Sequence, residues 1–391
     1  MDKRVYLFTV VSFVVGMVEL IIGGQLDLVA ADLHVSLGQA GLLITIFSLV
    51  YAISAPILLI ATAKMERKKL ILLSLCVFFI GNLLSALSPT YSVLMLARII
   101  SAISGSLLIV LCVTTASAIV SVQYRARAIG IVFMGVSGSL VLGVPIGLAL
   151  GNAFNWRAPF IFIAILTILS MVGVYFFMGK FPPKPAISIS AQLQTLKNRK
   201  IFFAQLTTFL FMAGHLTLYG YLTPFLKSEL GLSAGSVSIV YLIFGIAAVS
   251  GGGIGGYLSD RIGTKKTILS VIIAFAISLF ILPYTTFSLP IFLGVMFIWS
   301  MLSWAMTPAL QSYLIEASPE TADIQQSLNN SALHLGIAFG SMVGGIIIER
   351  SSVELNPTIG GVFVLIALCS AALSMKRKHK TATEIHYSKA Q

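Results

Sequence analysis

Charge is scarce in this sequence. Of its 391 residues only 10% are Asp, Glu, Lys or Arg, whereas 58% are hydrophobic, and the mean hydropathy is +1.00. A soluble protein carries about 25% charged residues, so the composition excludes an ordinary soluble domain. Because backbone groups in lipid must find hydrogen-bond partners within their own segment, we expect an all-α integral membrane protein.

Cysteine is also scarce, and common catalytic motifs are missing. Cys76, Cys112 and Cys369 each fall inside an apolar run, which predicts small core residues and neither a disulfide nor a metal site. The sequence contains no His-Glu-x-x-His helix, no Gly-x-Ser-x-Gly elbow and no Gly-x-x-x-x-Gly-Lys loop. We therefore do not expect an enzyme or a pump driven directly by ATP. A membrane-embedded enzyme or a receptor remains a less favoured alternative.

Long apolar runs dominate what is present. A membrane helix needs about 20 mostly apolar residues. Twelve runs meet this length, at residues 5–25, 38–62, 70–88, 92–120, 128–150, 157–179, 201–225, 235–258, 265–286, 289–313, 327–348 and 358–375.

The basic residues are distributed unevenly between these runs. With the N-terminus placed in the cytoplasm, 21 Lys and Arg residues fall on the cytoplasmic side, and three fall outside, namely Arg157, Lys227 and Arg350. The positive-inside rule therefore predicts twelve spans with both termini in the cytoplasm. The net charge of +12 is explained by these connections and does not indicate nucleic-acid binding. No small-residue cleavage site follows Lys3-Arg4, so we expect a retained first helix and not a signal peptide.

The chain divides into two related halves. A shift of 197 residues places Phe47 on Phe244, Asp32 on Glu229, and residues 35–38 (VSLG) on 232–235 (LSAG). We predict a six-helix bundle over 1–179, a cytoplasmic linker over 180–200, a second six-helix bundle over 201–375 and a basic cytoplasmic tail over 376–391. Transporters with parallel repeats bind substrate between the halves near the midplane.

One carboxylate lies deep in a span. Insertion of such a charge costs about 2.5–3.5 kcal/mol, and an intramembrane ionisable residue is by default a functional-site hypothesis. Glu19 is this residue, and Arg98 is the other full charge inside a span. A carboxylate placed between apolar packing and a guanidinium can change its protonation with access and substrate, which predicts proton coupling through Glu19 and Arg98. The alternative is a permanent structural ion pair.

Two histidines lie in spans. His215 is close to the repeat equivalent of Glu19, and His334 lies on the eleventh span. Because histidine titrates near neutral pH, either could join a proton relay or hydrogen-bond a substrate nitrogen. We assign His215 to coupling and His334 to substrate binding, with ordinary packing as the alternative for each.

Several motifs resemble those of the major facilitator superfamily, specifically its twelve-span drug:proton antiporters. The segment 256–266, GYLSDRIGTKK, matches the loop signature between the second and third helices of a half. Arg98 followed by Gly105 matches the fourth-helix arginine motif. The glycines and proline of the fifth span match the antiporter motif, at Gly138, Gly143, Pro145, Gly147 and Gly151. The first-half copy of the loop signature is degraded, with Leu59, Ala63 and Glu66 at its key positions.

This resemblance implies a conformational switch. The loop residues Gly256, Asp260, Arg261 and Gly263 are expected to form a latch that stabilises one access state, with a solvated turn as the alternative. In the fifth span, Gly143 and Gly147 allow close helix packing, and Pro145 bends the helix. We expect this seam to slide or bend during alternating access, in addition to packing.

A closer resemblance is to bacterial purine base and nucleoside efflux pumps. It lies in residues 17–24 (MVELIIGG), 124–135 (YRARAIGIVFMG), 214–226 (GHLTLYGYLTPFL), 303–316 (SWAMTPALQSYLIE) and 323–336 (DIQQSLNNSALHLG). It implies export of purines, and broad multidrug:proton antiport is the alternative.

A purine needs flat apolar faces for stacking and amides to read its edge. The residues that we expect to provide them are Phe47, Tyr51, Tyr219, Trp299, Trp304, Gln326, Asn329, Asn330 and His334. Packing against lipid is the alternative for each aromatic residue.

The predicted protein is thus a proton-coupled exporter of small molecules in the cell inner membrane. We expect no cofactor other than the proton gradient and no metal. Its expected partners are substrate, protons and the lipid bilayer, and not nucleic acid. We expect it to function as a monomer.

Overall fold

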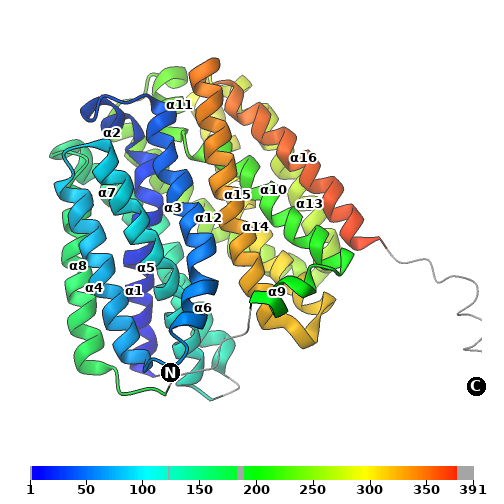
Figure 1. The fold of residues 1–391 in the computed structure, drawn as a ribbon. Helices are drawn as coiled ribbons and strands as arrows, with labels where there is room; N and C mark the ends of the chain where they lie inside the picture. Colours follow the sequence, from blue (N-terminus) through cyan, green and yellow to red (C-terminus); the bar gives the residue numbers. More distant parts are fainter. Residues whose placement is uncertain (1, 122–123, 183–188, 377–391) are drawn as a thin grey trace, which may run out of the picture.

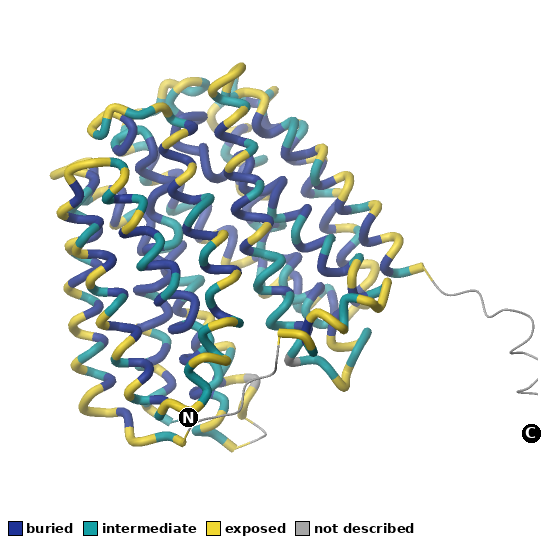
Figure 2. Tube along the Cα trace, viewed as in Figure 1, coloured by how far each residue is buried: buried dark blue, intermediate teal, exposed yellow. Residues whose placement is uncertain are grey.

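The computed structural model describes residues 2–121, 124–182 and 189–376 (Figure 1). Every regular element in these ranges is helical, and twelve helices are long and apolar enough to cross a membrane. The predicted fold class is confirmed. Many large apolar side chains point outward, for example Phe176 and Phe177, each 72% exposed. Figure 2 shows the buried residues where helices face one another.

The first half of the molecule contains eight α-helices. They are α1 (Lys3–Gly24), α2 (Leu26–Asp32), α3 (Leu37–Ala61), α4 (Arg67–Leu87), α5 (Tyr91–Ala118), α6 (Arg125–Gly138), α7 (Val144–Ala153) and α8 (Ala158–Phe177). A π-helical turn, η2 (Ser139–Gly143), joins α6 to α7, so the fifth span is one continuous helical segment. The bend that we expect at Pro145 stays a prediction.

The second half contains seven α-helices after a connecting helix, α9 (Ile189–Thr195). They are α10 (Arg199–Tyr219), α11 (Leu222–Leu230), α12 (Ala234–Ile262), α13 (Thr264–Ile281), α14 (Leu289–Ala317), α15 (Ala322–Arg350) and α16 (Leu355–Met375). Short 3-10 turns follow α13 at Leu282–Thr285 and precede α15 at Pro319–Thr321.

The structure differs from the sequence prediction at the end of the seventh span. The sequence predicts one helix over the apolar run 201–225, whereas α10 ends at Tyr219 and the separate helix α11 follows. The first half repeats this pattern, because α1 ends at Gly24 and α2 follows. Residues 183–188 of the predicted linker and 377–391 of the predicted tail lie outside the described residues. The proposed division into domains stays a prediction.

The membrane helices define two ends of the bundle. We call the end where α1 begins and α16 ends the terminal face, and the end that carries α2 and α11 the far face (Figure 1). The halves meet along α3 and α15, and along the fifth span and α12. Gly245 of α12 allows the second contact, because a Cβ there would lie 2.6 Å from the Cα of Val141 in the π-turn.

Most hydrogen bonds between the halves lie at the far face, whereas Ser331 donates to the Ala52 carbonyl at 3.1 Å nearer the terminal face. Thr223 donates to the Gly24 carbonyl at 2.9 Å, and Ser341 donates to the Gly41 carbonyl at 3.2 Å. Two charged contacts accompany them. These are the ion pair of Lys227 with Asp27 and the hydrogen bond from Ser36 to Glu349. The far face is therefore closed by direct contacts between α1–α3 and the second half.

Candidate functional site

Glu19 lies five residues before the end of α1 and faces the second half. Its side chain is 17% exposed, and its Oε1 lies 3.6 Å from Nδ1 of His334 on α15. Within the described residues Glu19 accepts no hydrogen bond and lies within ion-pair distance of His334 but not of Arg98. The partner expected from the sequence was Arg98, so the arrangement differs from the alternative of a fixed Glu19–Arg98 ion pair.

Arg98 is fully buried on α5, and its side chain contacts the backbone of α1. Its Nη1 donates to the carbonyl of Val18 at 2.7 Å, one residue before Glu19. Its Cζ lies 4.1 Å from the centroid of the Phe47 ring, a distance typical of a cation–π contact. Its Nε and Nη2 have no hydrogen-bond partner among the described residues. A buried guanidinium with spare donors is costly and provides a local positive charge for Glu19.

A row of aromatic rings leads from Arg98 across to the second half. Phe47 and Tyr51 lie one turn apart on α3, with ring centroids 5.9 Å apart. The Tyr51 ring then lies 4.0 Å from the His334 ring at an interplanar angle of 31°. The structure thus brings Glu19, Phe47, Tyr51, Arg98 and His334 together where the two halves meet.

His215 lies in a second aromatic cluster inside the second half. Its ring centroid lies 5.3 Å from that of Tyr219, 5.1 Å from Trp299 and 6.2 Å from Phe244. Within the described residues, the His215 Nδ1, the Tyr219 hydroxyl and the Trp299 Nε1 are buried without hydrogen-bond partners. His215 therefore contacts aromatic rings of its own half.

The predicted amides occupy the first two turns of α15, near the terminal face. Asn329 donates to Gln205 Oε1 at 3.1 Å and to Thr208 Oγ1 at 2.6 Å, both on α10. Gln326 donates to the carbonyl of Gln311 on α14 at 3.2 Å. These contacts hold α15 to its neighbours and place the amides away from the rings at Glu19. No described ring or hydrogen-bond contact brings Asn330 or Trp304 to those rings.

Gln205 and Thr208 were not among the residues predicted from the sequence. Gln205 Nε2 donates to the backbone carbonyl of Gln325 at 3.1 Å and so continues the chain of amides. The sequence feature that could have identified Gln205 is an uncharged amide inside an apolar run, because such a group is costly in lipid without a partner.

The loop residues of the predicted latch lie at the end of α12. Arg261 donates to the hydroxyl of Tyr257 at 3.2 Å, and Asp260 forms no ion pair with the described residues. Gly263 has φ of +88°, a conformation that favours glycine. The latch therefore stays a prediction. The presence of glycine at position 263 is explained by its backbone conformation.

The antiporter-motif glycines pack the fifth span against α1. Added Cβ atoms would collide with the side chain of Met17 at Gly143 and with that of Ile21 at Gly147. Such close approach is what small residues at this spacing permit. The static part of the expected role is visible here, and the sliding motion stays a prediction. Among the described residues no group of His, Cys, Asp and Glu could hold a metal ion.

Comparison with known proteins accounts for this architecture. The sequence profile described as Major Facilitator Superfamily matches residues 8–340 and, separately, 207–389. The uncharacterized MFS-type transporter YbcL of Bacillus subtilis is 35% identical over 97% of both chains, and the inner membrane transport protein YdhP of Escherichia coli is 28% identical over 95% of both. A D-xylose-proton symporter has the same fold, with a TM-score of 0.79 at 16% identity over 95% of this chain and 97% of that one. The chain therefore belongs to the Major Facilitator Superfamily, and it is a multi-pass membrane transporter and not an enzyme.

Proposed function

We propose that the protein exports purine bases, nucleosides or their analogues in exchange for protons. The observation that carries this proposal is the position of Glu19, where a carboxylate without a described hydrogen bond lies 3.6 Å from His334 of the other half. A proton-coupled exchanger needs a carboxylate that senses both access and substrate, and the contact between the halves is where access changes.

The surroundings of Glu19 favour coupling over a purely structural role. A structural ion pair would use the donors of Arg98, whereas Arg98 donates to the Val18 carbonyl and lies over Phe47. A carboxylate that is not locked into hydrogen bonds can gain or lose a proton without breaking the packing around it. Arg98 is then a positioning residue that places α1 and sets the local charge.

Aromatic faces with few polar groups favour a planar substrate. Tyr51 and His334 contribute rings from opposite halves that lie 4.0 Å apart at an angle of 31°, and Tyr219 and Trp299 contribute polar ring edges without described partners. A sugar would require many hydroxyl partners, and a bulky cationic dye would require a larger cavity with an acidic wall. Broad multidrug antiport remains the second candidate.

The proposed orientation in the membrane follows from the charge distribution. The terminal face, with its basic connections, is the cytoplasmic side of the inner membrane in this proposal. Since the far face is closed by contacts such as Thr223 with Gly24, this conformation would load substrate from the cytoplasm. The protein would work as a monomer with no cofactor other than the proton gradient.

Uptake into inverted membrane vesicles under an imposed pH gradient tests the proposal. Adenine, hypoxanthine, inosine and ethidium would be compared for the native protein and for Glu19→Gln. We expect gradient-driven accumulation of the purines by the native protein, abolished by an uncoupler. Glu19→Gln should lose driven accumulation and partly retain counterflow exchange. Unchanged accumulation in this variant would remove Glu19 as the coupling residue, and accumulation of ethidium in place of purines would favour multidrug antiport.

A further inference from the structure

The imidazole ring of His334 covers the face of Tyr51 that is turned toward the second half. The two ring centroids lie 4.0 Å apart, and His334 is 4% exposed. Aromatic pairs usually have their centroids about 4.5–7 Å apart, so these rings are in direct contact and no third ring fits between them. A planar ligand can therefore stack on this face of Tyr51 only after the imidazole has left it.

The second contact of the imidazole, with Glu19, is loose. Nδ1 of His334 lies 3.6 Å from Oε1 of Glu19, whereas N–H···O hydrogen bonds have lengths of about 2.7–3.2 Å. This Nδ1 is buried and has no hydrogen-bond partner among the described residues. The carboxylate thus keeps its capacity to accept a hydrogen bond from an N–H that comes closer.

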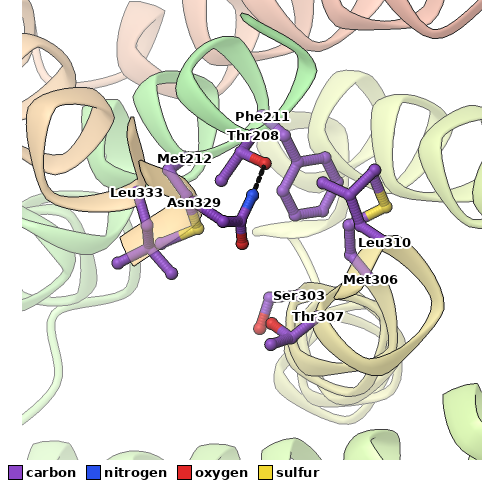
Figure 3. A pocket seen from close by; sticks show the side chains of 9 residues that line it. All are labelled: Thr208, Phe211, Met212, Ser303, Met306, Thr307, Leu310, Asn329 and Leu333. Carbon is purple, nitrogen blue, oxygen red and sulfur yellow. Dashed lines mark hydrogen bonds between the residues drawn. The ribbon is translucent and has the colours of Figure 1, made fainter. Parts of the chain in front are cut away.

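The space next to His334 on its terminal side is too small for a planar ligand. The recess between α10, α14 and α15, drawn in Figure 3, has a volume of about 20 Å³, which is room for about one water molecule. The backbone of α15 is held here, because Asn329 donates to Thr208 at 2.6 Å (Figure 3) and Ser331 donates to the Ala52 carbonyl at 3.1 Å. Rotation of the His334 side chain is therefore the smallest movement that frees the ring facing it.

We propose that the His334 imidazole occupies the place of the substrate in this conformation. A planar heteroaromatic ligand displaces it, stacks on Tyr51 and donates an N–H to Glu19. Imidazole is the five-membered ring of a purine, so the same two contacts recognise the side chain and the ligand. The inference rests on the proposed function, and it makes His334 an internal competitor whose removal strengthens binding.

Binding of radiolabelled adenine to the full-length protein in detergent tests this competition. His334→Ala removes the competing ring, and we expect the Kd for adenine to fall about three- to tenfold, the range for one aromatic contact. His334→Phe is the matched control, because it keeps a ring against Tyr51 and should give no such fall. A residue that only holds the substrate would behave in the opposite way. An unchanged or higher Kd in His334→Ala would overturn the proposal.

Free imidazole tests whether the vacated place and the ligand site are the same. It should raise the melting temperature of His334→Ala more than that of the native protein, because it fills the space that the side chain leaves. It should also raise the apparent Kd for adenine in this variant in proportion to its concentration, since one ligand excludes the other. Independent binding of imidazole and adenine to His334→Ala would contradict the proposal.

A measurement on the native chain does not depend on how His334→Ala folds. In protein with ¹³C-labelled histidine, the His334 ring signal is the one that is absent from His334→Phe. Adenine should move this signal downfield, because the imidazole leaves the shielding face of Tyr51, and an unmoved signal at saturating adenine would refute the displacement. Accumulation of purines in vesicles without displacement would keep the proposed function and refute this inference, and displacement without accumulation would do the reverse.

Discussion

Replacing Lys227 by Met should loosen the far face. Of the ion pairs within the described residues, two join the halves, namely Lys227 with Asp27 and His334 with Glu19. The side chains of Lys227 and Asp27 are 33% and 25% exposed, so the pair is partly screened, and about 1 kcal/mol is a reasonable upper value. Its loss should raise the population in which the far face is open about fivefold, because Met keeps the length of the side chain and removes only the charge.

A buried cysteine between the halves measures this opening. Ser341 is fully buried beside Gly41, so Ser341→Cys in a chain without its native cysteines should react with a membrane-impermeant maleimide only when the far face opens. Lys227→Met should raise the reaction rate about fivefold, and exchanging the charges of Asp27 and Lys227 should restore it. Arg157→Met is the matched control, because its ion pair at the same face stays within the first half. Equal rates for Lys227→Met and Arg157→Met would refute the role of the Lys227–Asp27 ion pair in closing the far face.

Two further predictions concern packing and pH. Gly340→Ala should destabilise the fold by about 1–3 kcal/mol, because its Cβ would lie 2.8 Å from a backbone Cα of α10, whereas Gly294→Ala, which meets nothing within 4 Å, should be neutral in thermal unfolding in detergent. The indole N–H of Trp156 and the guanidinium of Arg157 hold the pKa of Asp32 below its usual value. This stabilisation is present above the unfolded pKa near 4 and is lost as pH falls through the folded value. The melting temperature of Asp32→Asn should therefore lie below that of the native protein at neutral pH and approach it in acid, and parallel pH profiles would contradict this.

The fold could be predicted from the sequence because lipid leaves few options. Twelve apolar runs of sufficient length fix the number of helices, since each segment must satisfy its own backbone. The break after Tyr219 was missed because the apolar composition continues through it into α11. The first predicted run, in contrast, ends at residue 25, next to the end of α1 at Gly24. Hydropathy reports how readily each residue type leaves water, and it does not register a change in helix direction.

The site could be predicted in its residue types but not in its pairings. Glu19 and Arg98 stand out as charges in apolar runs, and both lie where the halves meet. The partner of Glu19 is His334, which lies 315 positions away and is brought there by the packing of α15 on α3. The orientation of Asn329 likewise depends on Gln205, because one amide fixes the next only once α10 and α15 are in contact.

Two kinds of contact close the far face. Lys227 and Asp27 form an ion pair whose side chains are 33% and 25% exposed, whereas Ser341 donates to the Gly41 carbonyl inside the protein. Dissolved salt screens exposed charges and leaves buried hydrogen bonds almost unchanged. Saline surroundings would consequently weaken one part of this closure and spare the other.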